Sequence, residues 1–85
     1  MIEFMHTVKD PNGMHARPAG LLVKEATRFS SEIMMYRGEK SASVKKLISL
    51  LTLSVKCGDT VRVSVIGEDE KEAADAISAY LRDHV

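Results

Sequence analysis

Two basic side chains, His15 and Arg17, stand two positions apart in the segment NGMHARPAG, residues 12–20. Regularly spaced apolar residues begin at Ala16 and predict a helix, which places His15 at its N-cap and Arg17 in its first turn. The positive end of a helix dipole repels cations, so two basic residues at this point indicate an anionic ligand. The first backbone N–H groups of a helix lack partners and would face the same ligand.

The chemistry predicted for His15 is transfer of a phosphoryl group through its imidazole. A neutral imidazole offers a nitrogen lone pair as nucleophile. Arg17 adds a fixed charge and a planar set of N–H donors that suits phosphate oxygens. Pro18 fixes φ early in the helix, where its missing N–H costs little hydrogen bonding. The segment therefore predicts a histidine that accepts a phosphoryl group and releases it to another molecule.

Strand and helix patterns alternate on both sides of this segment. Residues 2–8 alternate between apolar and polar side chains and predict a strand, with His6 on its apolar face. Apolar positions spaced i, i+3, i+4 and i+7 predict a helix that begins at Ala16 and ends at residues 28–30. Residues 32–43 contain two short strand candidates about a turn at Arg37-Gly38-Glu39.

The second half predicts a short helix, a strand and a closing helix. Residues 44–53 are too few for periodicity to separate a helix from a buried strand, and we favour a helix with Ser43 as its N-cap. Residues 59–67 alternate through three valines and predict a strand. Asp69 and Glu72 have the spacing of a capping box. The core face of the helix that follows is predicted to consist of Ala73, Ile77 and Leu81.

This order of elements predicts an α+β fold, a sheet with helices packed on one face, in a single domain spanning residues 1–85. The strand order stays open, and a ferredoxin-like arrangement also fits. Twelve basic and twelve acidic residues cancel, which argues against a general nucleic-acid or membrane-surface binder. Lys and Arg outnumber Asp and Glu by eight to five through residue 50, so a basic functional surface is expected in the first half.

Three features indicate a cytoplasmic protein. Cys57 is the only cysteine, which excludes an internal disulfide and fits a reducing compartment. No apolar run approaches the roughly 20 residues of a membrane span. No signal segment opens the chain, so we expect no membrane insertion.

The segment GMHARPAG resembles the active-site segment of HPr, the histidine-containing phosphocarrier of the bacterial phosphoenolpyruvate:sugar phosphotransferase system. GEKSASVKKLISLLTL resembles the region of that family's second helix, and GDTVRVSVIGEDEKEAADAI resembles its last strand and helix. The resemblance implies an open-faced β-sandwich with four antiparallel strands and three helices on one face. It also implies that His15 is the phosphoacceptor and that Arg17 holds the phosphate.

The implied partners are enzyme I, which donates phosphate derived from phosphoenolpyruvate, and a histidine of enzyme IIA, which receives it. The expected protein is a monomeric stoichiometric carrier, rather than an independent catalyst, and it needs no cofactor. Two alternatives stay open: a paralogue in a nitrogen-linked or regulatory phosphorelay, and an anion-binding interaction module whose histidine is never phosphorylated. The transported sugar is chosen by the partners, so this sequence does not identify it.

The resemblance further implies a small apolar docking surface for these partners. Its expected members are Gly20, Lys24, Lys46, Leu47, Ile48 and Leu51. One position departs from the family, because many HPr proteins of Gram-positive bacteria carry a regulatory serine where this chain has Lys46. Ser43 and Ser49 are near but out of register, so we expect no switch by serine phosphorylation. Lys45 and Lys46, in a predicted first helical turn, either meet acidic residues of a partner or are simply solvated.

The remaining candidates are expected to be structural or solvated. His6 is assigned to the first strand, and His84 is expected to lie in solvent. Cys57 falls in a predicted loop, where an incidental side chain is favoured over a reactive thiol. The three histidines and Cys57 lack the spacing of zinc ligands.

Overall fold

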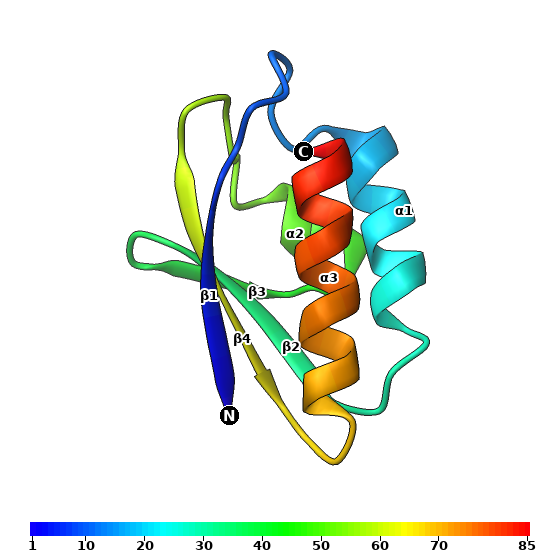
Figure 1. Cartoon of the computed structure of the whole chain (residues 1–85). Coiled ribbons are helices and arrows are strands. Elements are labelled where there is room, and N and C mark those ends of the chain that lie inside the picture. The colour runs from blue at the N-terminus through cyan, green and yellow to red at the C-terminus, as the bar shows by residue number, and fades with distance from the viewer.

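A four-stranded sheet and three helices make up the protein in a computed structural model that describes residues 1–85 (Figure 1). In chain order the elements are β1 (Ile2–Thr7), α1 (Ala16–Ala26), β2 (Glu32–Arg37), β3 (Lys40–Ser43), α2 (Leu47–Leu51), β4 (Thr60–Ile66) and α3 (Glu70–His84). The type and order of every element agree with the sequence patterns.

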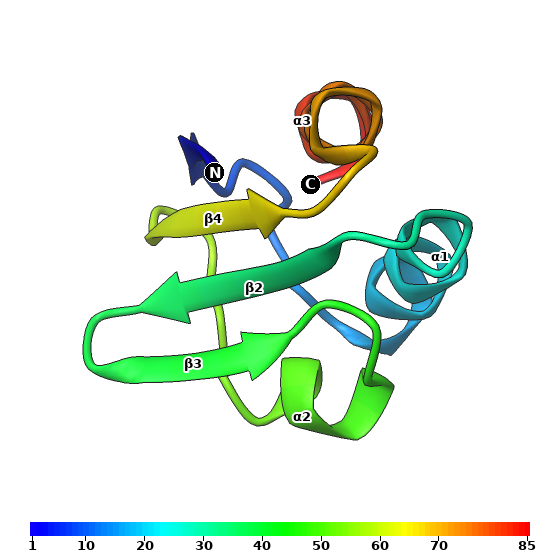
Figure 2. The same ribbon diagram turned by 90° about the horizontal axis from the view of Figure 1, so that it is seen from below.

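The strands follow the spatial order β1-β4-β2-β3, and every pairing is antiparallel. Val63, on β4, lies opposite Phe4 on one side and Met35 on the other, so the last strand occupies the middle of the sheet. The helices lie together on one side, and the other side of the sheet is uncovered (Figure 2). This is the predicted open-faced sandwich, and it settles the strand order that the sequence left open.

The core lies between the sheet and the helices. β4 buries its three valines completely because it has a neighbour on each side and helices over one face. Leu22 on α1 and Ile77 on α3 are also fully buried, and truncating a core leucine to alanine costs about 2–5 kcal/mol. The predicted core face of α3, Ala73, Ile77 and Leu81, is confirmed.

The predicted start of the short helix is wrong. α2 begins at Leu47, with Lys46 in the N-cap position and no side-chain cap. Ser43 belongs to β3, where it is paired with Met34, and its hydroxyl accepts the backbone N–H of Lys45 at 3.2 Å. The chain passes from β3 to α2 through residues 43–46, so the Ser43 hydroxyl closes a turn there instead of capping a helix.

The predicted capping box at the start of α3 is also wrong. Asp69 stands in the N-cap position, but its carboxylate makes no capping bond. It accepts the N–H groups of Ser30 and Ser31, at 2.9 Å each, and the Ser31 hydroxyl. The hydroxyl bond first, and then the N–H bonds, lower the pKa of Asp69 to about 2. The carboxylate thus ties α3 to the connection between α1 and β2.

Candidate functional site

The connection between β1 and α1 is anchored at both ends. The N–H groups of Lys9 and Asp10 donate to the main-chain oxygen of Val85 at 2.7 and 2.8 Å. Gly13 has φ of +66°, and a Cβ at that position would collide with the carbonyl of Val55. That same carbonyl accepts the N–H of Met14 at 3.0 Å. The residue that follows is therefore held at a fixed point above the core.

That residue is His15, and it occupies the predicted N-cap of α1. Its backbone is extended, with φ of −89° and ψ of 179°, and its carbonyl accepts the N–H of Ala19 at 3.1 Å. Its imidazole makes no capping bond, and 41% of its side chain is exposed. The N–H groups of Ala16 and Arg17 donate to no protein group, so they are free to bind an anion.

Arg17 is exposed and makes no ion pair or hydrogen bond within the chain. No acidic residue lies in the first turn of α1. The Arg17 guanidinium is therefore free to meet a ligand beside His15. Both residues border one pocket of about 280 Å³, which is lined by Asp10, His15, Arg17, Pro18, Leu21, Tyr80 and His84.

The last two turns of α3 complete this pocket with Tyr80, which the sequence patterns did not single out, and His84, which they placed in solvent. The Tyr80 hydroxyl donates to the Pro18 carbonyl at 2.8 Å, which ties α3 to the first turn of α1. Burial, and then the charge of Glu25, raise the pKa of this hydroxyl. The rings of Tyr80 and His84 are 4.7 Å apart. Their i, i+4 spacing was a readable signal of a shared helix face, but it does not reveal what that face covers.

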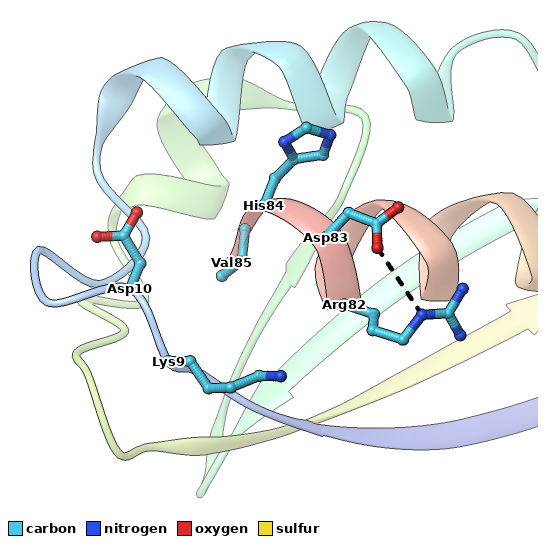
Figure 3. Close-up of a pocket in the computed structure, with 6 residues that line it drawn as sticks. All are labelled: Lys9, Asp10, Arg82, Asp83, His84 and Val85. Atoms are coloured by element: carbon cyan, nitrogen blue, oxygen red, sulfur yellow. Dashed lines mark ion pairs between the residues drawn. The ribbon is translucent and has the colours of Figure 1, made fainter.

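Asp10 also lines the pocket and lies close to His15. Its Oδ2 lies 3.6 Å from Nε2 of His15. Asp10 and His84 also border a neighbouring hollow, and both side chains extend toward α1 (Figure 3). The sequence patterns used DPNG only as a turn and missed this carboxylate. His84 is exposed as expected, yet it lies in the same pocket as His15.

The arrangement is suited to holding a tetrahedral anion against an imidazole. Free N–H groups and a guanidinium supply donors on one side, and the imidazole supplies a nucleophile. The pocket is shallow and open enough for a macromolecular partner to reach the ring.

Comparison with known proteins agrees with this geometry. Residues 2–83 match the family described as "PTS HPr component phosphorylation site". The chain belongs to the HPr family. It is 47% identical to the phosphocarrier protein HPr of Haemophilus influenzae over 70 residues, which are 82% of each chain. It is 35% identical to the HPr-like protein Crh of Bacillus subtilis over 85 residues, which are 100% of both chains.

Solved structures of HPr proteins share the fold. A histidine-containing phosphocarrier protein of Mycoplasma superimposes with a TM-score of 0.93 at 33% identity, covering 96% of this chain and 93% of the other. Crh of Bacillus subtilis gives a TM-score of 0.79 at 35% identity, covering 100% and 98%, and that protein is described as a domain-swapped dimer. The family places this chain among the phosphocarriers of the phosphotransferase system.

The predicted docking surface lies beside the His15 pocket, where α1 and α2 pack together. Ile48 is 73% exposed, whereas Leu47 and Leu51 are half-buried against the core. Lys24 and Lys46 are exposed, and a Cβ on Gly20 would meet nothing within 4 Å. Leu21, which the sequence analysis did not name, is 52% exposed and lines the pocket.

The two adjacent lysines have different environments. Lys45 donates from Nζ to the Phe29 carbonyl at 2.6 Å, so it fastens the end of the α1 region to the start of the α2 region. Lys46 is exposed. Both precede α2, which corrects their predicted placement in its first turn. Only Lys46 is available to a partner.

The other candidates lie outside the pocket. His6 keeps a buried Nε2 without a hydrogen-bond partner, and burial, followed by the charge of Lys9, lowers its pKa. Cys57 is exposed, with Sγ 3.7 Å from the Lys9 carbonyl. No three His, Cys, Asp or Glu side chains are grouped to hold a metal ion. None of the helices has the length and apolar character that crossing a bilayer requires.

Proposed function

We propose that this protein accepts a phosphoryl group on His15 from enzyme I and delivers it to enzyme IIA proteins. The observation that carries the proposal is the convergence of the His15 imidazole, the free N–H groups of α1 and the unpaired Arg17 on one pocket. The family supplies the class of chemistry. The acceptor atom in this proposal is Nδ1, the nitrogen nearer the main chain and the start of α1.

In the proposed reaction, the lone pair of His15 attacks phosphorus while the bond from phosphorus to the donor's histidine nitrogen breaks. Delivery reverses these steps toward the histidine of enzyme IIA. Arg17 and the N–H groups of α1 offset the charge on the phosphoryl oxygens, which is the main task in such transfers. The protein is changed in each cycle and acts as a carrier.

Docking in this proposal uses Gly20, Lys24, Lys46, Leu47, Ile48 and Leu51, with Leu21 at the edge of the pocket. The exposed Ile48 and Leu21 supply apolar area, and the two exposed lysines supply positive charge. A small surface of this kind suits a carrier that must leave each partner quickly. We propose a cytoplasmic monomer, and the single cysteine fits a reducing compartment.

A regulatory role is a second candidate, because the similarity to Crh covers 100% of both chains, whereas the similarity to HPr of Haemophilus influenzae covers 82%. Crh of Bacillus subtilis is described as a catabolite repression protein and as a dimer. Light scattering would separate a monomer from such a dimer. Phosphoryl transfer to a panel of sugar-specific and nitrogen-linked enzyme IIA proteins would assign the branch.

The deciding experiment is incubation with phosphoenolpyruvate and enzyme I, followed by intact mass measurement. We expect the gain of one acid-labile phosphoryl group and its loss when enzyme IIA is added. An unchanged mass would favour an anion-binding module instead. Phosphate that stays on the chain in the presence of every enzyme IIA would favour the regulatory role.

A further inference from the structure

The carboxylate of Asp10 is held in place by its own loop. Oδ1 accepts the N–H of Asn12 at 2.9 Å, which is an Asx turn. The Asp10 carbonyl accepts the N–H of Gly13 at 2.8 Å, and its N–H is bound to Val85. One oxygen and the backbone are therefore committed, and Oδ2 is the oxygen left to face Nε2 of His15 at 3.6 Å.

Asp10 is the only acidic residue that lines the pocket. The other titratable groups there are Arg17 from α1 and Tyr80 and His84 from α3. A carboxylate beside one imidazole nitrogen favours a proton on that nitrogen and leaves the lone pair on the other. Bonds of this kind are often long before a partner binds and shorten in the reacting complex.

We infer that Asp10 is a positioning residue that keeps the proton of His15 on Nε2 and so directs Nδ1 toward the incoming phosphoryl group. The inference rests on the proposed function of His15. On delivery, the Nδ1–P bond breaks, its electron pair returns to Nδ1, and the phosphoryl group bonds to the partner's nitrogen. The proton stays on Nε2, so the leaving group is a neutral imidazole rather than an imidazolate.

The tautomer can be measured without any phosphate, by ¹⁵N NMR of the histidine rings at a pH where His15 is neutral. D10N retains an oxygen for the N–H of Asn12 but turns an amide N–H₂ toward Nε2, which favours a proton on Nδ1. D10S keeps a hydroxyl for the turn and has no charge near the ring. D83N is the matched control, because Asp83 borders the neighbouring hollow and does not line the His15 pocket.

We expect the wild type and D83N to carry the His15 proton on Nε2, D10N to shift toward Nδ1, and D10S to lie between them. The rate of phosphoryl transfer should follow the same order, with D10N slower by about fivefold, as suits a partly exposed hydrogen bond to a charged group. Equal tautomer populations in D10N and D83N would overturn the inference. If the wild-type protein carries the His15 proton on Nε2 but accepts no phosphate, the result would instead contradict the proposed function.

Discussion

The starts of α1 and α3 are opposites. At α3, Asp69 binds Ser30 and Ser31, Glu70 accepts the N–H of Gly67 at 3.2 Å, and acidic side chains complement the helix dipole. At α1, the first turn has no acidic residue and its leading N–H groups have no partner. The acidic groups at the start of α3 are bound to the connection before β2 and to Gly67, and they stabilise the fold. The start of α1 has no acidic group and is available to an anionic ligand.

Replacing His15, at the start of α1, should have the largest effect on function. H15A should abolish acid-labile phosphorylation by enzyme I, because the nucleophile is gone, and should leave the fold intact, because the side chain is partly exposed. H6A is the matched control, since His6 lies on β1 and outside the pocket. Intact mass after incubation with phosphoenolpyruvate and enzyme I gives the answer. Phosphate on H15A would mean that the acceptor is another residue.

Arg17 should have the next largest effect. R17A should slow phosphoryl transfer by about tenfold or more, the loss expected when a charge-assisted contact of about 1.5–3 kcal/mol is removed. R17K should recover only part of the rate, because an ammonium group lacks the planar set of donors. R28A serves as the control, since Arg28 pairs with Glu25 beyond the far end of α1. Stopped-flow transfer from phosphorylated enzyme I would show an unchanged rate if Arg17 had no role.

The start of α3 should be the helix start that matters for stability, because Asp69 ties it to Ser30 and Ser31. The pKa of Asp69 is lowered to about 2, mainly by the Ser31 hydroxyl, so its contribution is complete above about pH 4 and is lost as the pH falls toward 2. D69N should therefore have a lower Tm than the wild type at pH 7, and the two values should converge in acid. Calorimetry between pH 2 and 7 tests this, and a gap that stays constant with pH would contradict it.

The docking surface should show a smaller, salt-dependent effect. K46E should weaken enzyme I binding by about two- to fivefold at low salt, because Lys46 is exposed beside Ile48 and its charge is screened by ions. K40E makes the same charge change on β3. Titration calorimetry at low and high salt compares the two variants. Equal effects of K46E and K40E on binding would show that Lys46 does not belong to the docking surface.

No effect is expected from the kinase that phosphorylates a serine in many HPr proteins of Gram-positive bacteria. By the resemblance to HPr, the position of that serine is taken by Lys46 in this chain, and the hydroxyl of Ser43 is engaged with the N–H of Lys45. Mass spectrometry after kinase treatment should show no stoichiometric phosphate. A phosphate on Ser43 or Ser49 would reverse this expectation.

The local sequence patterns predict the type and order of the helices and strands and part of the lining of the His15 pocket. The start of α1 follows from apolar spacing and from the residues around His15, so His15 and Arg17 were predicted in their correct positions. Asp10, Tyr80 and His84 were missed because no local pattern reports which distant element meets the start of α1.

The two wrong predictions of helix caps arise for the same reason that those pocket residues were missed. Ser43 and Asp69 are both residue types that cap helices, and local spacing favoured that use. Ser43 is committed to the exit from β3, and Asp69 to two N–H groups 38 and 39 residues away in the chain. The strand order was open for a similar reason, since the alternating pattern of β4 fits any position in the sheet.

The placement of β4 between β1 and β2 has a consequence for how the protein folds. β1 has no neighbour in the sheet other than β4, and Thr7 meets Thr60 across a separation of 53 residues. The loop that carries Asp10 is fastened by hydrogen bonds to the main-chain oxygen of Val85. A nascent chain therefore cannot assemble the His15 pocket until these late segments have emerged and docked, and contacts so distant in sequence form slowly. The ability to be phosphorylated should therefore appear last, in one cooperative step. Enzyme I would then meet either the fully folded protein or a chain that it cannot phosphorylate.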